Sequence, residues 1–238
     1  MKKLILVCLL SAIIPLAHSQ ILISLLLGDK LNSDGVEFGI QGGLNWSSIQ
    51  NMESTRYLGH LNMGFYFDLR LKNQWNLYTG VLVKSNLGLH KLEKSDLEFL
   101  NPPEYSPDGN YRQQISYFIL PALIKYKFKN HFYVELGAQG GLMISAWTEY
   151  VLKSDQSDVR IRDFNTDKIN RIDAGLSGGF GYKLLKGEGF TIGVRYYQGL
   201  ANVYKGRLGT YNNSIFFNVC IPIGVGKKEA KEAKKETS

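Results

Sequence analysis

The segment LNMGFYFDLRLKNQWNLYTGVLVK, residues 61–84, alternates apolar and polar side chains with a period of two. One face of its first half carries Leu61, Met63, Phe65, Phe67, Leu69 and Leu71, and the other carries Asn62, Gly64, Tyr66, Asp68, Arg70 and Lys72. After Asn73-Gln74 the alternation resumes, with Trp75, Leu77, Thr79, Val81 and Val83 on one side and Asn76, Tyr78, Gly80, Lys84 and Asn86 mostly on the other. Because successive side chains of a β-strand point to opposite faces, the segment predicts a hairpin of two strands with a tight turn.

The same period recurs along the chain and predicts eight strands, at residues 35–49, 57–71, 75–92, 113–128, 131–147, 169–184, 188–200 and 211–224. Short and long connections alternate strictly. The short ones are 72–74, 129–130 and 185–187, and the long ones are 50–56, 93–112, 148–168 and 201–210. In an up-and-down meander this places every short turn at one end and every long loop at the other, as in transmembrane barrels. An even number of strands also returns both chain ends to the short-turn side.

Alternation alone does not decide which face of such a barrel points inward. A soluble barrel would enclose the apolar face and expose the polar one. Here the polar face is also rich in glycine, at Gly39, Gly64, Gly137, Gly179 and Gly193 among others, which suits the crowded lumen of a small barrel. The strands also exceed the ~9–11 residues that cross a bilayer at a tilt. We therefore predict an all-β fold, an eight-stranded antiparallel up-and-down transmembrane β-barrel, with a soluble barrel as the alternative.

The charges on the polar face are expected inside the barrel, because a charge facing lipid at mid-bilayer costs roughly 2–4 kcal/mol. This predicted lumen network comprises Glu37, Asp68, Arg70, Lys84, Lys125, Glu135, Arg171, Asp173 and Arg195. Ion pairs among them should fill the interior, since eight strands leave room for side chains but for no open channel. On the apolar face, the aromatic side chains expected at the membrane interface are Trp46, Trp75, Phe128, Phe132, Tyr182 and Phe190.

The ends of the chain differ in composition from the predicted barrel. Residues 1–19, MKKLILVCLLSAIIPLAHS, combine a basic start, an apolar run and small residues before the expected cleavage site, and predict a secretory signal peptide. Residues 20–34 contain the apolar run ILISLLL, which is expected to pack at the periplasmic rim of the barrel at 35–224. Residues 225–238 form a Lys/Glu-rich tail that is expected to be disordered.

Charge and cysteine content exclude some partners and cross-links. Removal of the signal peptide would leave Cys220 as the only cysteine, so no intramolecular disulfide is expected. The formal net charge of +7 lies partly in the signal peptide and the tail. The body of the chain is then only mildly basic, and we therefore expect no nucleic-acid partner.

Four parts of the sequence carry a resemblance to a known family. They are FGIQGGLNWSSI, YFILPALIKYKF, HFYVELGAQGGLMIS, and LSGGFGYKL followed by GFTIGVRYYQGLANV. Over residues 35–224 the chain resembles the PorT-like outer-membrane β-barrel family, also called the porin family. The resemblance implies the outer membrane of a Gram-negative bacterium, with N- and C-termini in the periplasm, and some relatives are accessory components of a secretion system. One departure is that Lys227 to Ser238 follow the last strand, where such barrels often end on an aromatic residue.

Candidate catalytic and metal-binding residues are few. His60 and His90 lie on the polar face near strand ends, close in sequence to Glu93 and Asp96, but a lipid-modifying enzyme needs a nucleophile, a base and an orienting acid together. The acidic residues of the loop 148–168 do not have the spacing of a calcium loop. We expect no catalytic residue, no cofactor and no metal site.

The expected function is a structural or interaction role through the long loops, in contact with outer-membrane lipid. One alternative is an accessory subunit with a protein partner in a secretion or envelope-assembly machine. The other is a lipid-modifying outer-membrane enzyme.

Overall fold

The computed structural model describes residues 35–106, 108–153, 158–187 and 189–223. The expected signal peptide, the apolar segment 20–34 and the tail 225–238 lie outside the described residues. Within the described ranges, no helix has the length and apolarity to cross a membrane.

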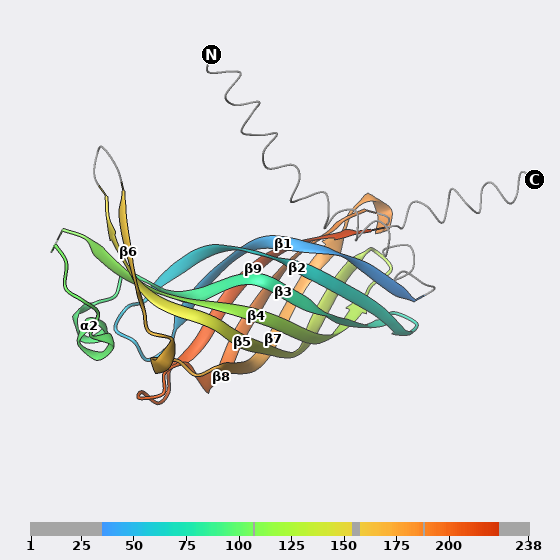
Figure 1. The fold of residues 1–238 in the computed structure, drawn as a ribbon. Helices are drawn as coiled ribbons and strands as arrows, with labels where there is room; N and C mark the ends of the chain where they lie inside the picture. Colours follow the sequence, from blue (N-terminus) through green and yellow to red (C-terminus); the bar gives the residue numbers. More distant parts are fainter. Residues whose placement is uncertain (1–34, 107, 154–157, 188, 224–238) are drawn as a thin grey trace, which may run out of the picture.

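Antiparallel strands close into a ring (Figure 1). They are β1 (Val36–Ile49), β2 (Arg56–Lys72), β3 (Trp75–His90), β4 (Asn110–Lys127), β5 (Phe132–Leu152), β6 (Val159–Phe164), β7 (Ile172–Lys183), β8 (Thr191–Asn202) and β9 (Tyr211–Pro222). The sheet order is β4-β3-β2-β1-β9-β8-β7-β5-β6, and pairing of β4 with β5 closes the ring of eight strands. Strand β6 stays outside the ring, added to β5. The predicted all-β antiparallel barrel is confirmed.

The long loops contain elements that the period-two pattern did not predict. Helix α2 (Lys94–Leu100) lies in the loop 93–112, and β6 lies in the loop 148–168. Two short 3-10 helices, η1 (Thr166–Lys168) and η2 (Leu185–Gly187), complete the elements. Strands β4 and β5 also remain paired beyond the end of β3, so the sheet is prolonged on one side of the long-loop end (Figure 1).

A β-bulge in β3 corrects one prediction. Toward β4 the register passes from Leu82 with Ile119 to Ser85 with Tyr117, so three steps along β3 oppose two along β4. The ladder toward β2 shifts at the same place. An extra residue reverses the alternation of side chains. Lys84 is therefore exposed on the outside of the barrel, not in the lumen as predicted.

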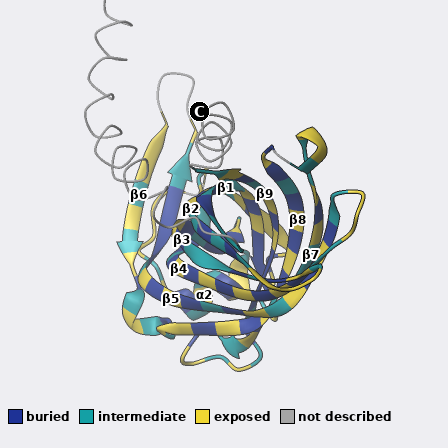
Figure 2. Ribbon diagram, turned by 90° about the vertical axis from the view of Figure 1, so that its right-hand side faces the viewer, coloured by how far each residue is buried: buried dark blue, intermediate teal, exposed yellow. Residues whose placement is uncertain are grey.

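Buried and exposed residues alternate along the ring strands (Figure 2). The buried side chains form two layers inside the ring. Toward the short turns lies a polar layer that contains Asp68, Lys125, Glu135 and Arg195. Toward the long loops lies an apolar layer that includes Ile49, Leu82, Leu87, Leu89, Ile115, Ile119, Met143 and Phe216. Apolar side chains such as Leu61, Leu136, Ile172 and Leu200 cover the outside. An apolar exterior around a partly polar interior is the arrangement expected of a barrel in a membrane.

Candidate functional site

Four buried charged side chains meet in the lumen near the short-turn end. The Asp68 carboxylate accepts hydrogen bonds from Lys125 Nζ at 3.0 Å and from Lys127 Nζ at 2.9 Å. Glu135 accepts a hydrogen bond from Arg195 Nε at 2.8 Å and lies 3.6 Å from Lys125 Nζ. Charges of alternating sign thus cross the barrel from β2 through β4 and β5 to β8. The predicted lumen network did not include Lys127, although the alternation of the sequence places it on the same face as Lys125.

Tyrosine rings pack against the cations of this layer. Lys125 Nζ lies 4.1 Å from the ring centroid of Tyr78 and 4.5 Å from that of Tyr133. The Arg195 guanidinium lies 4.8 Å from the Tyr78 centroid, and Tyr66 stacks on Tyr78 at 5.8 Å. Cation–π contacts add to the ion pairs in neutralising the buried cations. The polar layer is therefore packed with side chains.

Two further acids of the predicted network have other partners than expected. Asp173 is buried, but it accepts a hydrogen bond from Asn212 Nδ2 at 3.1 Å. Glu37 lies nearer the short-turn mouth, where it pairs with Lys183, a cation that the sequence reasoning missed. Glu37 also accepts a hydrogen bond from Tyr66 Oη at 3.0 Å.

Arg70 and Arg171 are exposed, which contradicts their predicted place in the lumen. Arg70 lies near the end of β2, past the charged layer, where the barrel opens toward the short turns. Arg171 precedes the first residue of β7, so strand alternation does not determine its direction. Near the ends of the strands, alternation along the sequence therefore does not predict which side chains face the lumen.

Aromatic side chains form a row on the outside of the barrel near the short turns. Ring centroids of Trp75 and Tyr126 lie 4.9 Å apart, those of Tyr126 and Phe128 4.9 Å, and those of Phe128 and Phe132 5.8 Å. Tyr182 is also exposed at this end, as is Phe190 just before β8, whereas Trp46 is exposed on β1 toward the long loops. Their role at a membrane interface stays a prediction.

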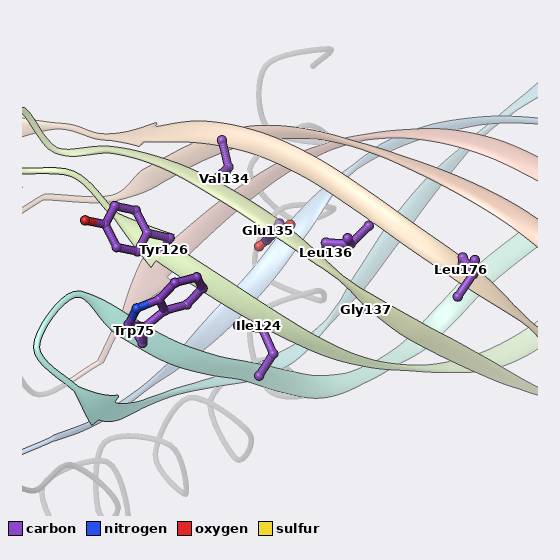
Figure 3. A pocket seen from close by; sticks show the side chains of 8 residues that line it. All are labelled: Trp75, Ile124, Tyr126, Val134, Glu135, Leu136, Gly137 and Leu176. Atoms are coloured by element: carbon purple, nitrogen blue, oxygen red, sulfur yellow. The ribbon is translucent and has the colours of Figure 1, made fainter.

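An open apolar groove of about 570 Å³ lies beside this row on the outer surface (Figure 3). Its lining includes Trp75, Ile124, Tyr126, Val134, Leu136 and Leu176, from strands β3, β4, β5 and β7. The Glu135 side chain projects from β5 between these residues, and its carboxylate belongs to the buried layer of the lumen (Figure 3). The groove therefore offers an apolar lining to whatever surrounds the barrel.

Helix α2 lies at the long-loop end and adds to the apolar layer. Leu100 is buried within that layer, and its carbonyl oxygen accepts a hydrogen bond from Lys168 Nζ. Phe99 packs edge-on against Tyr204, with 5.3 Å between ring centroids. Residues of three connections thus join over the long-loop end, and we name this arrangement around α2 the cap.

Asp96 fastens the cap, since its fully buried carboxylate accepts hydrogen bonds from the amides of Glu53 and Ser54, each at 2.9 Å. Asp96→Ala removes both acceptors, and we expect it to loosen the cap by about 1–3 kcal/mol. Limited proteolysis of the refolded protein should then cleave the loop 93–112 faster. Asp108→Ala, an exposed acid in the same loop, is the matched control. Equal cleavage rates in the two variants would contradict the role of Asp96.

Beyond the ring, β4, β5 and β6 form a three-stranded sheet around Glu149. This side chain is only 1% exposed and lies between Arg112 and Arg162 of the flanking strands. Arg112 Nε donates to it at 2.6 Å, Arg162 Nε at 3.0 Å, and Gln114 Nε2 at 2.8 Å. Burial alone would raise the pKa of Glu149, but hydrogen bonds and charge from Arg162 and Arg112 hold that pKa below its usual range.

The lowered pKa of Glu149 predicts that acid loosens this sheet. The cluster contributes its full stabilisation above the ordinary glutamate pKa of about 4.3 and loses it as the pH falls toward the lowered pKa of the folded state. We expect amide exchange in β6, corrected for intrinsic rates, to accelerate more than in β8 between about pH 7 and about pH 3. Glu149→Gln should abolish this difference, and a pH response retained in that variant would exclude Glu149 as its source.

The two candidate histidines do not form a catalytic arrangement with the nearby acids. His90 is exposed at the end of β3, and Asp96 is occupied by backbone amides. Glu93 pairs with Lys91 at 3.7 Å. In the part of the chain that the structure describes, no group of three or more His, Cys, Asp or Glu side chains is placed to hold a metal ion.

Comparison with known protein families gives the ring its context. A family model described as "Outer membrane protein beta-barrel domain" matches residues 29–205, more than half of the chain. The chain belongs to this family. Barrels of this family lie in the lipid of the Gram-negative outer membrane, so the apolar exterior and its groove face lipid. This assignment decides against the soluble barrel.

Solved structures of small outer-membrane barrels are similar to the chain at low sequence identity. Ail, the attachment invasion locus protein of Yersinia pestis, is 11% identical, with 80% of this chain and 100% of that chain covered and a TM-score of 0.43. Neisserial surface protein A is 12% identical, with 79% and 99% covered and a TM-score of 0.38. OprG from Pseudomonas aeruginosa is 14% identical, with 80% and 95% covered and a TM-score of 0.32. No curated protein matches the sequence.

Proposed function

We propose that this outer-membrane barrel is a binding protein with a closed lumen, which acts through its long-loop end and does not conduct solutes. The observation that carries the proposal is the filled interior. A layer of ion pairs occupies the short-turn half, the apolar layer together with buried uncharged polar side chains occupies the other half, and the cap lies over the long-loop end. Eight strands enclose about the volume that such side chains fill.

Planar-bilayer recording tests the closed lumen. We expect the purified barrel to insert without sustained conductance, because no continuous water path crosses two packed layers. The Asp96→Ala variant should stay closed as well, since it loosens only the cap. Steady, large openings in the unaltered protein would overturn the proposal.

Strand β6 supports the binding role. It ends the sheet order and pairs with β5, so its other edge can accept an extended segment of a partner. Phe164 is 66% exposed on this strand, and Arg160 is also exposed. An exposed apolar side chain, an exposed cation and a free strand edge on the same strand suit a protein partner.

Affinity purification from outer membranes, with a photo-crosslinker at position 164, tests this surface. We expect a protein partner to crosslink, and the exposed substitutions Arg160→Glu and Phe164→Ser to abolish its co-purification. Leu208→Ser, an exposed apolar residue of another loop, should leave co-purification unchanged. Absence of a partner, or equal loss in the Leu208 variant, would contradict a binding role for β6.

The proposed orientation places both chain ends in the periplasm and the long loops outside the cell. Its support is that β1 begins and β9 ends at the short-turn end, where Gly39 pairs with Pro222, and that outer-membrane barrels have periplasmic short turns. Protease added to intact cells should cleave the loop 93–112 and spare an epitope appended after Ser238. Cleavage of the epitope alone would reverse the orientation.

A second candidate function is an accessory subunit of a secretion or envelope-assembly machine. The PorT-like sequence resemblance favours it, and the free edge of β6 offers a contact for a neighbouring subunit. Gentle detergent extraction followed by native electrophoresis should then yield a stable complex of fixed composition. Migration as a single chain under these conditions would leave the first proposal as the better one.

A further inference from the structure

The wall of the barrel contains a seam between β2 and β3. Their ladder includes Tyr57 with Leu89 and resumes only at Met63 with Lys84, which leaves residues 58–62 and 85–88 between the two pairings. Across this interval β2 stays paired with β1, and β3 stays paired with β4. The seam, defined as residues 58–62 and 85–88, therefore separates two intact parts of the sheet.

Strand β3 is held at the seam by side chains of β1. Asn45 Nδ2 donates to the Asn86 carbonyl at 2.9 Å, and the Gly88 amide donates to Ser47 Oγ at 2.9 Å. Gly88 has φ +150°, and a Cβ added there would lie 2.0 Å from the Gln113 carbonyl oxygen. Glycine fits this backbone without strain, and Gly88 thus permits the path that β3 takes at the seam.

Buried polar atoms without a hydrogen-bond partner in the described structure gather at the seam. They are Asn45 Oδ1, His60 Nε2, Asn62 Oδ1 and Nδ2, and Ser85 Oγ. Asn45 and Ser85 are fully buried and Asn62 is 2% exposed, while Asn45 and His60 are register partners. A buried polar group left without a partner costs about 1–3 kcal/mol. Several such atoms at one level leave a hydrogen-bonding capacity that groups from outside the chain can meet.

The surroundings of the seam indicate what that ligand is. On the outer surface Leu61 and Met63 are 67% and 51% exposed, and Lys84 is exposed as register partner of Met63. Trp46 and Tyr57 are exposed at neighbouring positions, and such aromatic residues favour the membrane–water boundary. The outer surface of the seam is thus apolar with one cation, and its aromatic neighbours suit the level where headgroups lie. The unpartnered atoms lie directly behind this surface.

We propose that the seam is a lateral binding site for a hydroxyl-bearing lipid headgroup. The unpartnered atoms offer both donors and acceptors and carry no formal charge when His60 is neutral, which suits hydroxyl groups. Lys84 at the outer edge adds a cation for an anionic group on the same lipid. This site is separate from the proposed partner surface on β6, and either can fail without the other.

Hydrogen–deuterium exchange in lipid nanodiscs tests the seam. Phosphatidylglycerol supplies hydroxyl groups and net negative charge, and phosphatidylcholine supplies neither. In phosphatidylcholine we expect the amides of 58–62 to exchange about tenfold or more faster than those of the β7–β8 ladder, whose register has no shift. In phosphatidylglycerol they should slow by about threefold or more, as expected for a bound ligand.

Variants separate hydroxyl binding from charge attraction. Asn62→Leu and Ser85→Ala should each reduce the protection by phosphatidylglycerol, and Lys84→Ala should weaken it further. Ser177→Ala is the control, because this buried hydroxyl bonds to the Tyr196 carbonyl at 3.2 Å on the β7–β8 side. Heat-modifiable electrophoretic mobility confirms folding of each variant, and Ser85→Ala keeps the test intact if Asn62→Leu misfolds.

Three outcomes would overturn the proposal. Seam amides as slow as those of the β7–β8 ladder would mean a closed wall. Equal exchange in both lipids would mean that water alone fills the site. Protection lost in Lys84→Ala but kept in both Asn62→Leu and Ser85→Ala would mean simple charge attraction at the surface.

Discussion

Replacing Glu135 with leucine should destabilise the barrel by about 3–5 kcal/mol, because it leaves a buried cation without its partner. Arg195 donates to Glu135 at 2.8 Å, and Lys125 Nζ lies 3.6 Å from the same carboxylate. Lys125 keeps its contact with Asp68 at 3.0 Å in the variant. Arg195 has no such second carboxylate among its described ion pairs. Urea unfolding of barrel refolded in detergent micelles, followed by tryptophan fluorescence, measures the change in free energy.

Two further variants separate charge from shape in the same assay. Arg70→Ala removes an exposed charge of the predicted network and should change stability by no more than about 0.5 kcal/mol. Combining Glu135→Leu with Arg195→Met should recover most of the loss, since apolar residues of similar volume often replace a buried ion pair at little cost. A loss in Glu135→Leu no larger than in Arg70→Ala would contradict a stabilising network. A double variant as unstable as the single one would assign the loss to packing.

The period-two alternation of side chains was enough to predict the barrel and part of its charged layer, because this period is a direct consequence of strand geometry. The segment 61–84 lies in β2 and β3 as predicted. Its tight turn includes Asn73, whose φ of 52° is the left-handed conformation that asparagine tolerates. Asp68, Glu135 and Arg195 lie inside regularly paired stretches of their strands, and each is buried in the lumen.

Lys84 is a residue whose direction the period-two alternation does not predict. The bulge that turns it outward adds one residue to β3, and no turn residue marks the place. Its cause is a long-range contact, in which Asn45 and Ser47 of β1 bond to the β3 backbone. Such contacts depend on how the ring closes, so a single strand pattern cannot contain them.

At the long-loop end, the sequence contains local patterns that the strand prediction did not use. In β6, Val159 and Ile161 alternate with Arg160 and Arg162, which is the same period of two on a shorter scale. Residues 115–120 are apolar on both faces, as expected for a strand whose inward side joins the apolar layer. The convergence of Arg112 and Arg162 on Glu149 had no such signal, because it joins three strands across two loops.

Replacing Gly43 with alanine should destabilise the barrel by about 1–3 kcal/mol or more, since the added methyl group has no space. A Cβ at this position would lie 1.9 Å from the carbonyl oxygen of Phe217 and 3.2 Å from the Cα of Asn218. Both atoms belong to the backbone of β9, which a rotamer change cannot move. Gly43 and Asn218 are register partners where β1 meets β9, so the clash falls on the pairing that joins the first strand to the last.

Gly140→Ala is the matched control, because a Cβ built at Gly140 meets no atom within 4 Å. The same substitution in β5 should be neutral or stabilise by about 0.4–1 kcal/mol through the lower entropy of the unfolded chain. The folded fraction after refolding, read from heat-modifiable mobility, and the urea midpoint both report the difference. Similar stabilities of the two variants would show that β1 and β9 can separate without loss, and that the glycines of the lumen do not set how closely these strands approach.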